Sequence, residues 1–441
     1  MRFQNRMDSW MRRHFELSRG GMTNIQAMEG LRGFAVLLVF FAHYVAVMLP
    51  WISENSWTYS VAGLLRNIGH AGVDLFFVMS GYLIYAALIK RERKFLEFFK
   101  GRVLRIYPAF LFMFAVYVVL SLALPHESKF PQDTQSGLVY TIQNLLLLPG
   151  VFPIESLIIV TWSLGYEMAY YVCMPLLISA LAMRKWTPRT RLLFFLGVSA
   201  VAFTWFYSNY GNGLVRMLMF LSGVVIYEIQ KQDLYRPKPG TALFAFGIAC
   251  ALMVLIKINC LQGWWRYLML FFMFGYVCLE AFNGKGSTAR MLSWSPLRWF
   301  GNMSYSYYLC HGLCLKATVF VLARIYAPSG NENFLFWGLM IPAFGITLIG
   351  SGALFLFVER PMSLFATQPN FGKHRELLGI PNDGGIATLV WRSCVPVLAA
   401  TRIVWRESVN SLRLLVGKPP LQLDDSEDVA GFKRFTNFRL V

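Results

Sequence analysis

One arginine and one histidine in the first apolar segment of the sequence are spaced for chemistry on a single helix. Arg32 and His43 are eleven residues apart, about three turns, so both lie on one face, separated by a rise of about 16 Å. Arginine binds phosphates and carboxylates, and histidine exchanges protons near neutral pH. The spacing predicts a slot with an acidic ligand head at Arg32 and a reactive group at His43. A buried histidine that only hydrogen-bonds a neighbouring helix is the alternative.

A second pair of cationic side chains, Arg102 and Arg105, follows a basic loop and enters a later apolar segment. At a spacing of three residues they share a helix face, and two guanidinium groups there suit bidentate contacts to phosphates. Anchoring to anionic lipid headgroups is the equal alternative. The pair therefore predicts an anion site at this helix end without deciding between a bound ligand and the membrane surface.

Few other ionisable side chains lie in apolar segments, where each costs roughly 2.5–3.5 kcal/mol at the bilayer centre. Asp74 lies near one end of its segment and is expected to face water. Glu167 lies among aromatic residues, which are typical both of sugar stacking and of membrane interfaces. His311 lies beside Cys310 and near Cys314, a pattern that helix packing explains better than a Cys/His nucleophile. Glu167 is a catalytic candidate, and Asp74 and His311 are supporting candidates.

No sequence pattern indicates a metal centre or a bound cofactor. The seven cysteines are an odd number, most lie in apolar runs, and no CxxC or Cys/His cluster has the spacing of a metal site. A P-loop, an HExxH motif and a GxSxG elbow are also absent from the sequence. We therefore expect neither a metal ion nor a permanently bound cofactor.

The helices that must position these residues are predicted from composition. Of the 441 residues, 56% are hydrophobic and 15% are charged, whereas soluble domains have about 45–50% apolar and about 25% charged residues. This argues against a soluble enzyme and against a disordered chain. The net charge of +18 would suggest nucleic acid in a soluble protein. Here basic cytosolic loops account for it, so no nucleic-acid partner is expected.

Ten apolar segments predict an all-α, polytopic membrane protein with about ten transmembrane helices. Loops on one side carry 22 Lys and Arg residues and those on the other about four, which places both the N- and the C-terminus in the cytosol. A weak apolar piece at 141–149 is expected to be re-entrant or interfacial. The ten segments are 30–50, 70–89, 106–124, 157–183, 192–207, 214–229, 241–256, 266–282, 300–323 and 334–358.

These segments divide the chain into three regions. We expect residues 1–29 to form a basic cytosolic arm without a signal peptide and residues 30–360 to form the ten-helix membrane domain. Residues 361–441 are expected to form a cytosolic tail, in which an apolar patch at 389–405 is expected to be an interfacial helix.

Short motifs in a fixed order make the sequence resemble the acyltransferase 3 family of integral membrane acyltransferases. They cover roughly residues 25–362, and the ordered set is highly specific although each motif alone is weak. The matching pieces are Leu31-Arg32-Gly33 with His43, Gly72-Val73-Asp74-Leu75-Phe76-Phe77 with Ser80-Gly81, Arg102-x-x-Arg105-Ile106-x-Pro108, Trp162-Ser163-Leu164 with Glu167 and Tyr171, Arg216 with Gly223, Ser304-Tyr305-Ser306 with Tyr308-Leu309 and His311, and Glu359-Arg360-Pro361.

The resemblance implies a ten-helix fold, acyl-CoA as donor and co-substrate, and an acceptor hydroxyl on the far side of the membrane. By position, His43 matches the family's essential histidine, and Arg102 and Arg105 match the arginine pair that handles the donor, with Arg32 beside them. His43 would take the acceptor proton or briefly carry the acyl group. The wording around Glu167 is similar to that of members acting on exopolysaccharide.

We therefore expect a multi-pass protein of a bacterial inner membrane, surrounded by membrane lipid. It would move an acyl group, expected to be acetyl from acetyl-CoA, to a sugar hydroxyl of an exopolysaccharide or another cell-surface glycan. The sequence does not indicate an oligomeric state.

Two other classes of function stay open. A proton-coupled transporter would use the intramembrane His, Asp and Glu residues as a relay, although no repeated half or paired broken helices are visible. A structural assembly partner would use the same charges only for packing, and changes at His43 or Arg105 would then leave the cell's glycans unaltered. Binding of acyl-CoA to the purified protein separates the enzyme from both.

Overall fold

The computed structural model describes residues 10–12, 14–17, 23–131, 133–210, 215–257, 265–284 and 286–365. This part of the chain is helical and contains no β-strand, only an isolated bridge in a loop. The α-helices are α2 (Thr23–Met48), α3 (Trp57–Gly69), α4 (Ala71–Lys90), α5 (Phe95–Ala123), α6 (Thr134–Leu145), α7 (Thr161–Ala180), α8 (Pro188–Tyr210), α10 (Met219–Lys231), α11 (Thr241–Lys257), α12 (Trp265–Asn283), α13 (Ser287–Leu292), α14 (Ser295–Asn302), α15 (Ser304–Ile325) and α16 (Asn333–Leu354). Short 3₁₀ helices are η1 (Leu49–Trp51), η2 (Pro125–Glu127), η3 (Met183–Lys185) and η4 (Arg216–Leu218), and the π-helical segment η5 (Phe355–Phe365) follows α16.

Each of the ten predicted apolar segments contains a helix, which confirms the all-α class. Five helical stretches are long and apolar enough to cross a membrane, and α11 and α12 contain shorter apolar stretches. The number of ten crossings and the cytosolic position of both termini remain predictions. The five long stretches are Gln26–Trp51, Trp57–Lys90, Phe95–Ala123, Ser304–Ile325 and Asn333–Arg360.

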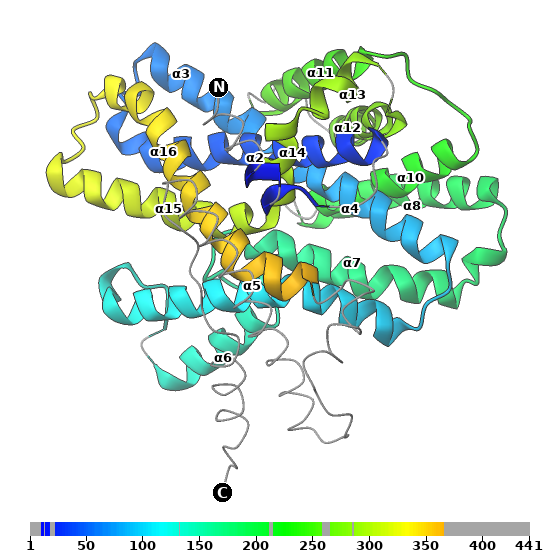
Figure 1. Cartoon of the computed structure of the whole chain (residues 1–441), viewed down its shortest axis with the longest axis horizontal. Helices are drawn as coiled ribbons and strands as arrows, with labels where there is room; N and C mark the ends of the chain where they lie inside the picture. The colour runs from blue at the N-terminus through cyan, green and yellow to red at the C-terminus, as the bar shows by residue number, and fades with distance from the viewer. Residues whose placement is uncertain are drawn as a thin grey trace, which may run out of the picture.

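The long helices run roughly side by side, so their ends gather at two sides of the molecule (Figure 1). The connections that follow α2, α5 and α15 lie together at the left of this view. These are three of the loops that the charge pattern assigns to the non-cytosolic side.

Helices α4 and α10 pack with their backbones in close contact because glycines lie between them. A Cβ atom at Gly81 would be 2.0 Å from the carbonyl oxygen of Phe220, and one at Gly223 would be 2.1 Å from that of Val78. No side chain fits at such distances, and small residues are the usual means by which membrane helices approach. The contact fixes α4, which supplies one wall of the site described below.

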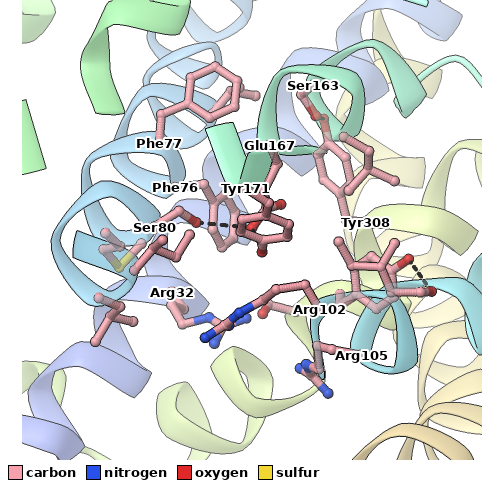
Figure 2. A pocket seen from close by; sticks show the side chains of 18 residues that line it. Arg32, Phe76, Phe77, Ser80, Arg102, Arg105, Ser163, Glu167, Tyr171 and Tyr308 are labelled. Atoms are coloured by element: carbon pink, nitrogen blue, oxygen red, sulfur yellow. Dashed lines mark hydrogen bonds between the residues drawn. The ribbon is translucent and has the colours of Figure 1, made fainter. Parts of the chain in front are cut away.

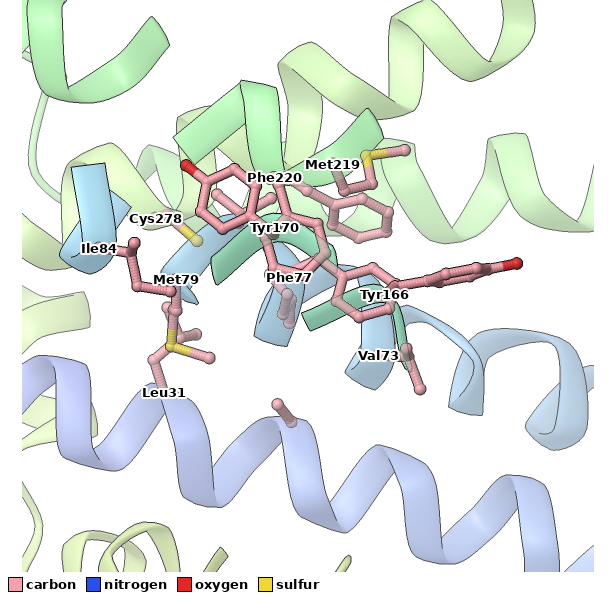
Figure 3. Close-up of a cluster of buried hydrophobic side chains, with 14 of the residues drawn as sticks. Leu31, Val73, Phe77, Met79, Ile84, Tyr166, Tyr170, Met219, Phe220 and Cys278 are labelled. Carbon is pink, nitrogen blue, oxygen red and sulfur yellow. The ribbon is translucent and has the colours of Figure 1, made fainter. Parts of the chain in front are cut away.

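Aromatic rings fill the interior between α4, α7 and α10 (Figure 3). Phe220 stacks on Phe77 and on Tyr170, in both cases with ring centroids 4.6 Å apart. The hydroxyl of Tyr170 donates a hydrogen bond to the carbonyl oxygen of Gly81 at 3.3 Å, so its polar group is satisfied in the core. Such pairs contribute about 0.5–1.5 kcal/mol beyond the area they bury, and here they hold α7 in position.

Helix α3 is a feature that the hydrophobic pattern did not predict. Its N-cap is Ser56, whose side chain accepts a hydrogen bond from the backbone N–H of Tyr59 at 3.2 Å. Polar residues such as Arg66 and Asn67 interrupt its apolar pattern, so the hydrophobic pattern alone predicts a loop there. Helix α4 follows after His70, so that α3 and α4 form one continuous helical stretch.

The segment predicted as one span at 300–323 is divided at Met303, between α14 and α15. The carboxylate of Glu359 accepts hydrogen bonds from the backbone N–H of Ser306 at 3.0 Å and from its hydroxyl at 2.5 Å. It therefore caps the first turn of α15, whose N–H groups have no intrahelical partners. Because Glu359 is 53 residues farther along the chain, no local pattern indicates this break.

The basic arm predicted at 1–29 packs against the helical domain over its described part. Phe15 is buried and stacks on Phe355, with ring centroids 5.5 Å apart. Arg298 of α14 forms an ion pair with Glu16 at 2.9 Å. The arm is thus held to the domain by an apolar contact and by a charged one.

Two of the predicted region boundaries need comment. Helix α2 begins at Thr23, seven residues before the predicted start of the membrane domain, because the helix extends beyond its most apolar part. The interfacial helix predicted at 389–405 lies outside the described residues, which end at residue 365.

Candidate active site

Helices α2, α4, α5, α7 and α15 surround a cavity of about 160 Å³. Figure 2 shows its three arginines gathered along one side and Phe77 and Ser163 at the opposite side. The lining consists of Arg32, Val73, Phe76, Phe77, Met79, Ser80, Leu83, Ile84, Arg102, Arg105, Ile106, Ser163, Leu164, Glu167, Tyr171, Ser304, Tyr305 and Tyr308.

The structure brings together the three arginines that the sequence analysis placed at the donor site. Arg32 comes from α2 and Arg102 and Arg105 come from α5, and all three line the cavity (Figure 2). Helix α5 runs from Phe95 to Ala123, so the two arginines follow one another on one helix, as expected.

The two arginines of α5 have different partners. Arg105 forms an ion pair with the fully buried Glu359, with Nη1 and Oε1 2.8 Å apart. Within the described ranges Arg102 has no carboxylate partner, and its guanidinium lies over the rings of Phe98 and Tyr171, 5.1 and 5.5 Å from their centroids. Cation–π contacts use the face of a guanidinium and leave its N–H edge for an anion. Arg102 is therefore better placed than Arg105 to bind a phosphate.

Glu167 of α7 lies in the cavity among hydroxyl groups (Figure 2). Its Oε1 accepts hydrogen bonds from Tyr171 at 2.5 Å and from Ser80 of α4 at 3.3 Å. It forms no ion pair with any arginine or lysine of the described segments. A carboxylate held by neutral donors keeps further lone pairs for a substrate. Glu167 is therefore positioned to orient a polar group inside the cavity.

Two hydroxyl groups, those of Ser163 and Tyr308, meet at the side of the cavity opposite to the arginines. Their oxygens are 2.6 Å apart and connect α7 to α15. The ring of Tyr308 also contacts His311, with centroids 6.0 Å apart. Tyr308 thus lies between the cavity and a histidine that does not line it.

His43 and His311 are brought together although they are far apart in the sequence. Their ring centroids are 4.8 Å apart and their planes are inclined by 82°. His43 lies on α2, partly buried, and its Nδ1 is 3.0 Å from the carbonyl oxygen of Val39. His311 lies on α15, fully buried, and its Nδ1 is 2.8 Å from the carbonyl oxygen of Tyr307. The uninterrupted α2 places Arg32 at the cavity and His43 at this histidine pair.

The expectation that Asp74 faces water is wrong. Its side chain is 3% exposed and forms a bidentate ion pair with Arg216 of η4, at 2.9 and 2.7 Å. The same guanidinium donates to the carbonyl oxygen of His70 at 2.6 Å. Asp74 therefore joins α4 to the start of α10 and is not among the residues that line the cavity.

Sequence reasoning missed several polar residues of the site, namely Ser80, Ser163, Tyr305 and Tyr308, and the role of Glu359. The first four lie inside the ordered motifs of the sequence, and their hydroxyl groups on otherwise apolar helices were a usable signal. The pairing of Glu359 with Arg105 joins distant segments and had no local signal. Among the described residues, no group of three or more His, Cys, Asp or Glu side chains could hold a metal ion.

Residues 25–356 match a family model described as an acyltransferase domain, which covers most of the chain. The chain belongs to the acyltransferase 3 family. This confirms the resemblance found in the sequence motifs, and the cavity, its arginines and the histidine pair all lie within the matched residues of the acyltransferase domain.

Three bacterial O-acetyltransferases are similar to this chain in sequence. O-acetyltransferase OatA of Staphylococcus aureus (strain NCTC 8325 / PS 47) is 30% identical over 65% of this chain and 50% of its own. Peptidoglycan O-acetyltransferase OatA of Listeria monocytogenes serovar 1/2a is 24% identical over 77% of this chain and 56% of its own. Putative peptidoglycan O-acetyltransferase YrhL of Bacillus subtilis (strain 168) is 28% identical over 77% of this chain and 55% of its own.

The chain spans about half the length of the curated relatives it matches. No solved structure is significantly similar to it.

Proposed function

We propose that the protein is a membrane O-acetyltransferase that moves the acetyl group of cytosolic acetyl-CoA to a hydroxyl group of a cell-surface glycan. One observation carries the proposal. A cavity has three arginines along one side and, at the opposite side, a tyrosine in contact with a histidine pair. A donor with phosphates at one end and a thioester at the other requires this separation of anion-binding and proton-exchanging groups.

The size of the cavity supports the orientation of the donor. Pockets for drug-sized ligands occupy about 300–1,000 Å³. The cavity, at about 160 Å³, suits the slender thioester arm of CoA but not its nucleotide. The phosphates would therefore lie at the arginine side of the cavity, against Arg102 and Arg32, with the nucleotide outside it, and the thioester would extend past Glu167 toward Tyr308.

The proposed chemistry is general base catalysis by His43. Its Nε2 takes the proton of the acceptor hydroxyl while the hydroxyl oxygen attacks the thioester carbonyl carbon. The new C–O bond forms, the C–S bond breaks, and CoA leaves as a thiolate that must be protonated. Glu167, with its hydroxyl partners, orients the thioester arm inside the cavity.

The acceptor class is proposed from the relatives. The names of two of them contain peptidoglycan, which is a sugar polymer outside the cytoplasm. We therefore place the acceptor among cell-surface glycans, with peptidoglycan and exopolysaccharide as the two candidates. The corresponding location is the bacterial inner membrane, where cytosolic acetyl-CoA and an external glycan reach opposite faces of one protein.

The buried carboxylates do not favour the transporter alternative. Asp74 is paired with Arg216, and Glu228 with Arg191, where Oε1 and Nε are 2.5 Å apart. Glu280 accepts hydrogen bonds from backbone N–H groups at the start of α11. A proton relay needs carboxylates that are free to exchange protons along a path. These three are held by fixed structural partners.

Mass spectrometry of cell-surface and secreted glycans tests the proposed function. Cells would carry the wild-type protein, no protein, the His43→Ala variant, or the control variant His126→Ala, which changes an exposed histidine outside the site. We expect the deletion and His43→Ala to lose one acetyl unit, 42 Da, from the same glycan, and His126→Ala to retain it. The fraction that loses the acetyl group identifies the acceptor as peptidoglycan or exopolysaccharide.

Two results would contradict the proposal. If the glycans keep their acetyl groups in cells without the protein, cell-surface glycans are not its acceptors. Full acetylation by His43→Ala, at a protein level equal to wild type, would remove His43 as the base.

A further inference from the structure

We infer that His311 is a second proton-exchanging residue of the site, which returns to the leaving thiolate the proton that His43 takes from the acceptor. The inference rests on the proposed function. The inference goes beyond the proposed function because it assigns a general acid to the step in which the CoA thiolate leaves.

Hydrogen bonds fix the same tautomer in both histidines. Each Nδ1 faces a backbone carbonyl oxygen one turn earlier in its helix, that of Val39 for His43 and that of Tyr307 for His311. A carbonyl oxygen only accepts hydrogen bonds, so each Nδ1 carries the hydrogen and each neutral ring keeps a lone pair at Nε2. Two imidazole bases therefore lie in contact, each with Nε2 ready to take a proton.

The Nε2 atom of His311 is buried and has no hydrogen-bond partner among the described residues. A buried acceptor without a donor costs about 1–3 kcal/mol, so such an atom in a native structure needs an explanation. The adjacent Tyr307 does not supply the donor, since its ring stacks on that of His311 at 5.2 Å and its hydroxyl bonds to Thr347. The ring of His43, with its centroid 4.8 Å from that of His311, can supply this donor once it has taken the proton of the acceptor.

His311 connects the cavity to His43, because its ring contacts Tyr308 on one side and His43 on the other. Tyr308 lines the cavity and contacts His311, whereas His43 contacts His311 and is not among the lining residues. A thioester in the cavity therefore leaves its thiolate on the side of His311. An acceptor that approaches from the C-terminal end of α2 meets His43 first.

His43 and His311 together then account for every proton that the reaction moves. The O–H bond of the acceptor breaks, and its proton goes to Nε2 of His43 as the C–O bond forms. The C–S bond breaks and leaves its electron pair on sulfur. The proton passes to Nε2 of His311 and from there to the thiolate, so that an S–H bond forms and both rings end neutral. No oxidant, reductant or further reactant is needed.

The role of His311 is tested with two acetyl donors whose leaving groups differ in their need for protonation. Full-length protein in detergent would transfer acetyl groups to the glycan purified from deletion cells and freed of acetyl groups by mild base. The donors are acetyl-CoA, whose thiolate leaves best with an acid, and 4-nitrophenyl acetate, whose phenolate leaves as an anion. The variants are His311→Leu, which fills the site without a polar atom, His43→Ala, and the control His126→Ala.

We expect His311→Leu to lower kcat with acetyl-CoA by roughly 100-fold, with KM for acetyl-CoA unchanged, because general acid catalysis contributes about 10²–10⁴-fold. With 4-nitrophenyl acetate the loss should be less than about threefold. His43→Ala should lose activity with both donors, because the acceptor proton must be removed in either case. Thermal unfolding of each variant shows whether it is folded.

Equal losses with both donors, or no loss with acetyl-CoA, would assign His311 to packing and overturn the inference. If the wild-type protein does not use the ester, the solvent deuterium isotope effect on kcat with acetyl-CoA decides, and an identical effect in His311→Leu overturns the inference. Wild-type protein that transfers no acetyl group from acetyl-CoA would instead reject the proposed function itself.

Discussion

Glu167 differs from Asp74, Glu228 and Glu359 in its partners, which are the hydroxyl groups of Tyr171 and Ser80, whereas those three carboxylates pair with arginines. A charge-assisted hydrogen bond to a carboxylate is about twice as strong as a neutral one, and removing the charge weakens every contact that the group makes. At the scale of single residues, Glu167 is therefore a position where a change to glutamine removes the charge and keeps the shape of the side chain.

The Glu167→Gln variant is expected to lower kcat by roughly 10–100-fold with little change in KM for acetyl-CoA. Hydrogen bonds to charged groups contribute about 1.5–3 kcal/mol, and the amide keeps the size of the side chain. Steady-state kinetics of the purified protein measure this. The matched control is Glu155→Gln, which changes an exposed carboxylate outside the cavity. Full activity in Glu167→Gln would restrict Glu167 to packing.

Arg102→Ala is expected to raise KM for acetyl-CoA by roughly 10–100-fold, because a guanidinium that contacts a phosphate contributes about 1.5–3 kcal/mol. S-acetylpantetheine has no phosphate at this position, so its use should not change. The control Arg93→Ala alters an exposed loop arginine and should affect neither donor. A loss that is equal for both donors would show that Arg102 supports the cavity wall instead of the phosphates.

At the scale of elements, Glu359 connects three of them. It lies in η5, caps the first turn of α15 through Ser306, and forms an ion pair with Arg105 of α5. Two of the helices that form the cavity are therefore held by one buried carboxylate. Removing one partner of a buried pair leaves an uncompensated charge, which costs more than the pair itself contributes.

Glu359→Gln is therefore expected to destabilise the protein by about 3–5 kcal/mol, seen as a lower Tm in detergent. The double variant Arg105→Met/Glu359→Leu removes both charges and should recover much of this loss. The control Asp233→Asn breaks an exposed ion pair with Arg236 and should leave Tm nearly unchanged. An unchanged Tm in Glu359→Gln would show that the pair does not hold α5 to α15.

Helix positions were predictable from the sequence, whereas contacts between helices were not. Each of the ten predicted apolar runs contains a helix, and the spacing of Arg32 and His43 indicated their common helix. The break at Met303 and the burial of Asp74 depend on partners that lie 53 and 142 residues away. Local patterns carry no information about such partners, so the expectation that Asp74 faces water was wrong, whereas the span predicted at 300–323 was displaced by only a few residues from the observed Ser304–Ile325.

The candidate site was likewise predictable in part. The three arginines selected for phosphate chemistry do line one cavity, and their role at a donor remains a prediction. The contact between His43 and His311 was not predicted, because it depends on how α2 packs against α15.

At the scale of the whole molecule, the charge pattern predicts which helix ends face the cytosol. A single cysteine at exposed Ala327, in the loop after α15, should react in intact cells with a maleimide that does not cross membranes. One at exposed Arg93, in the loop after α4, should react only after the cells are permeabilised. Both variants would be made in a background without the native cysteines. The reverse pattern of labelling would show that the protein has the opposite orientation in the membrane. The arginines would then lie on the side that cytosolic CoA does not reach.

The lining of the cavity includes the hydroxyl contact of Ser163 with Tyr308 and does not include His43. The ring of His311 contacts Tyr308 of this wall and also His43 beyond it, so these side chains connect the arginine side to the histidine side. In the proposed reaction the phosphates of the donor and the acceptor hydroxyl therefore stay on different sides of the wall, and only the acetyl group changes from one side to the other.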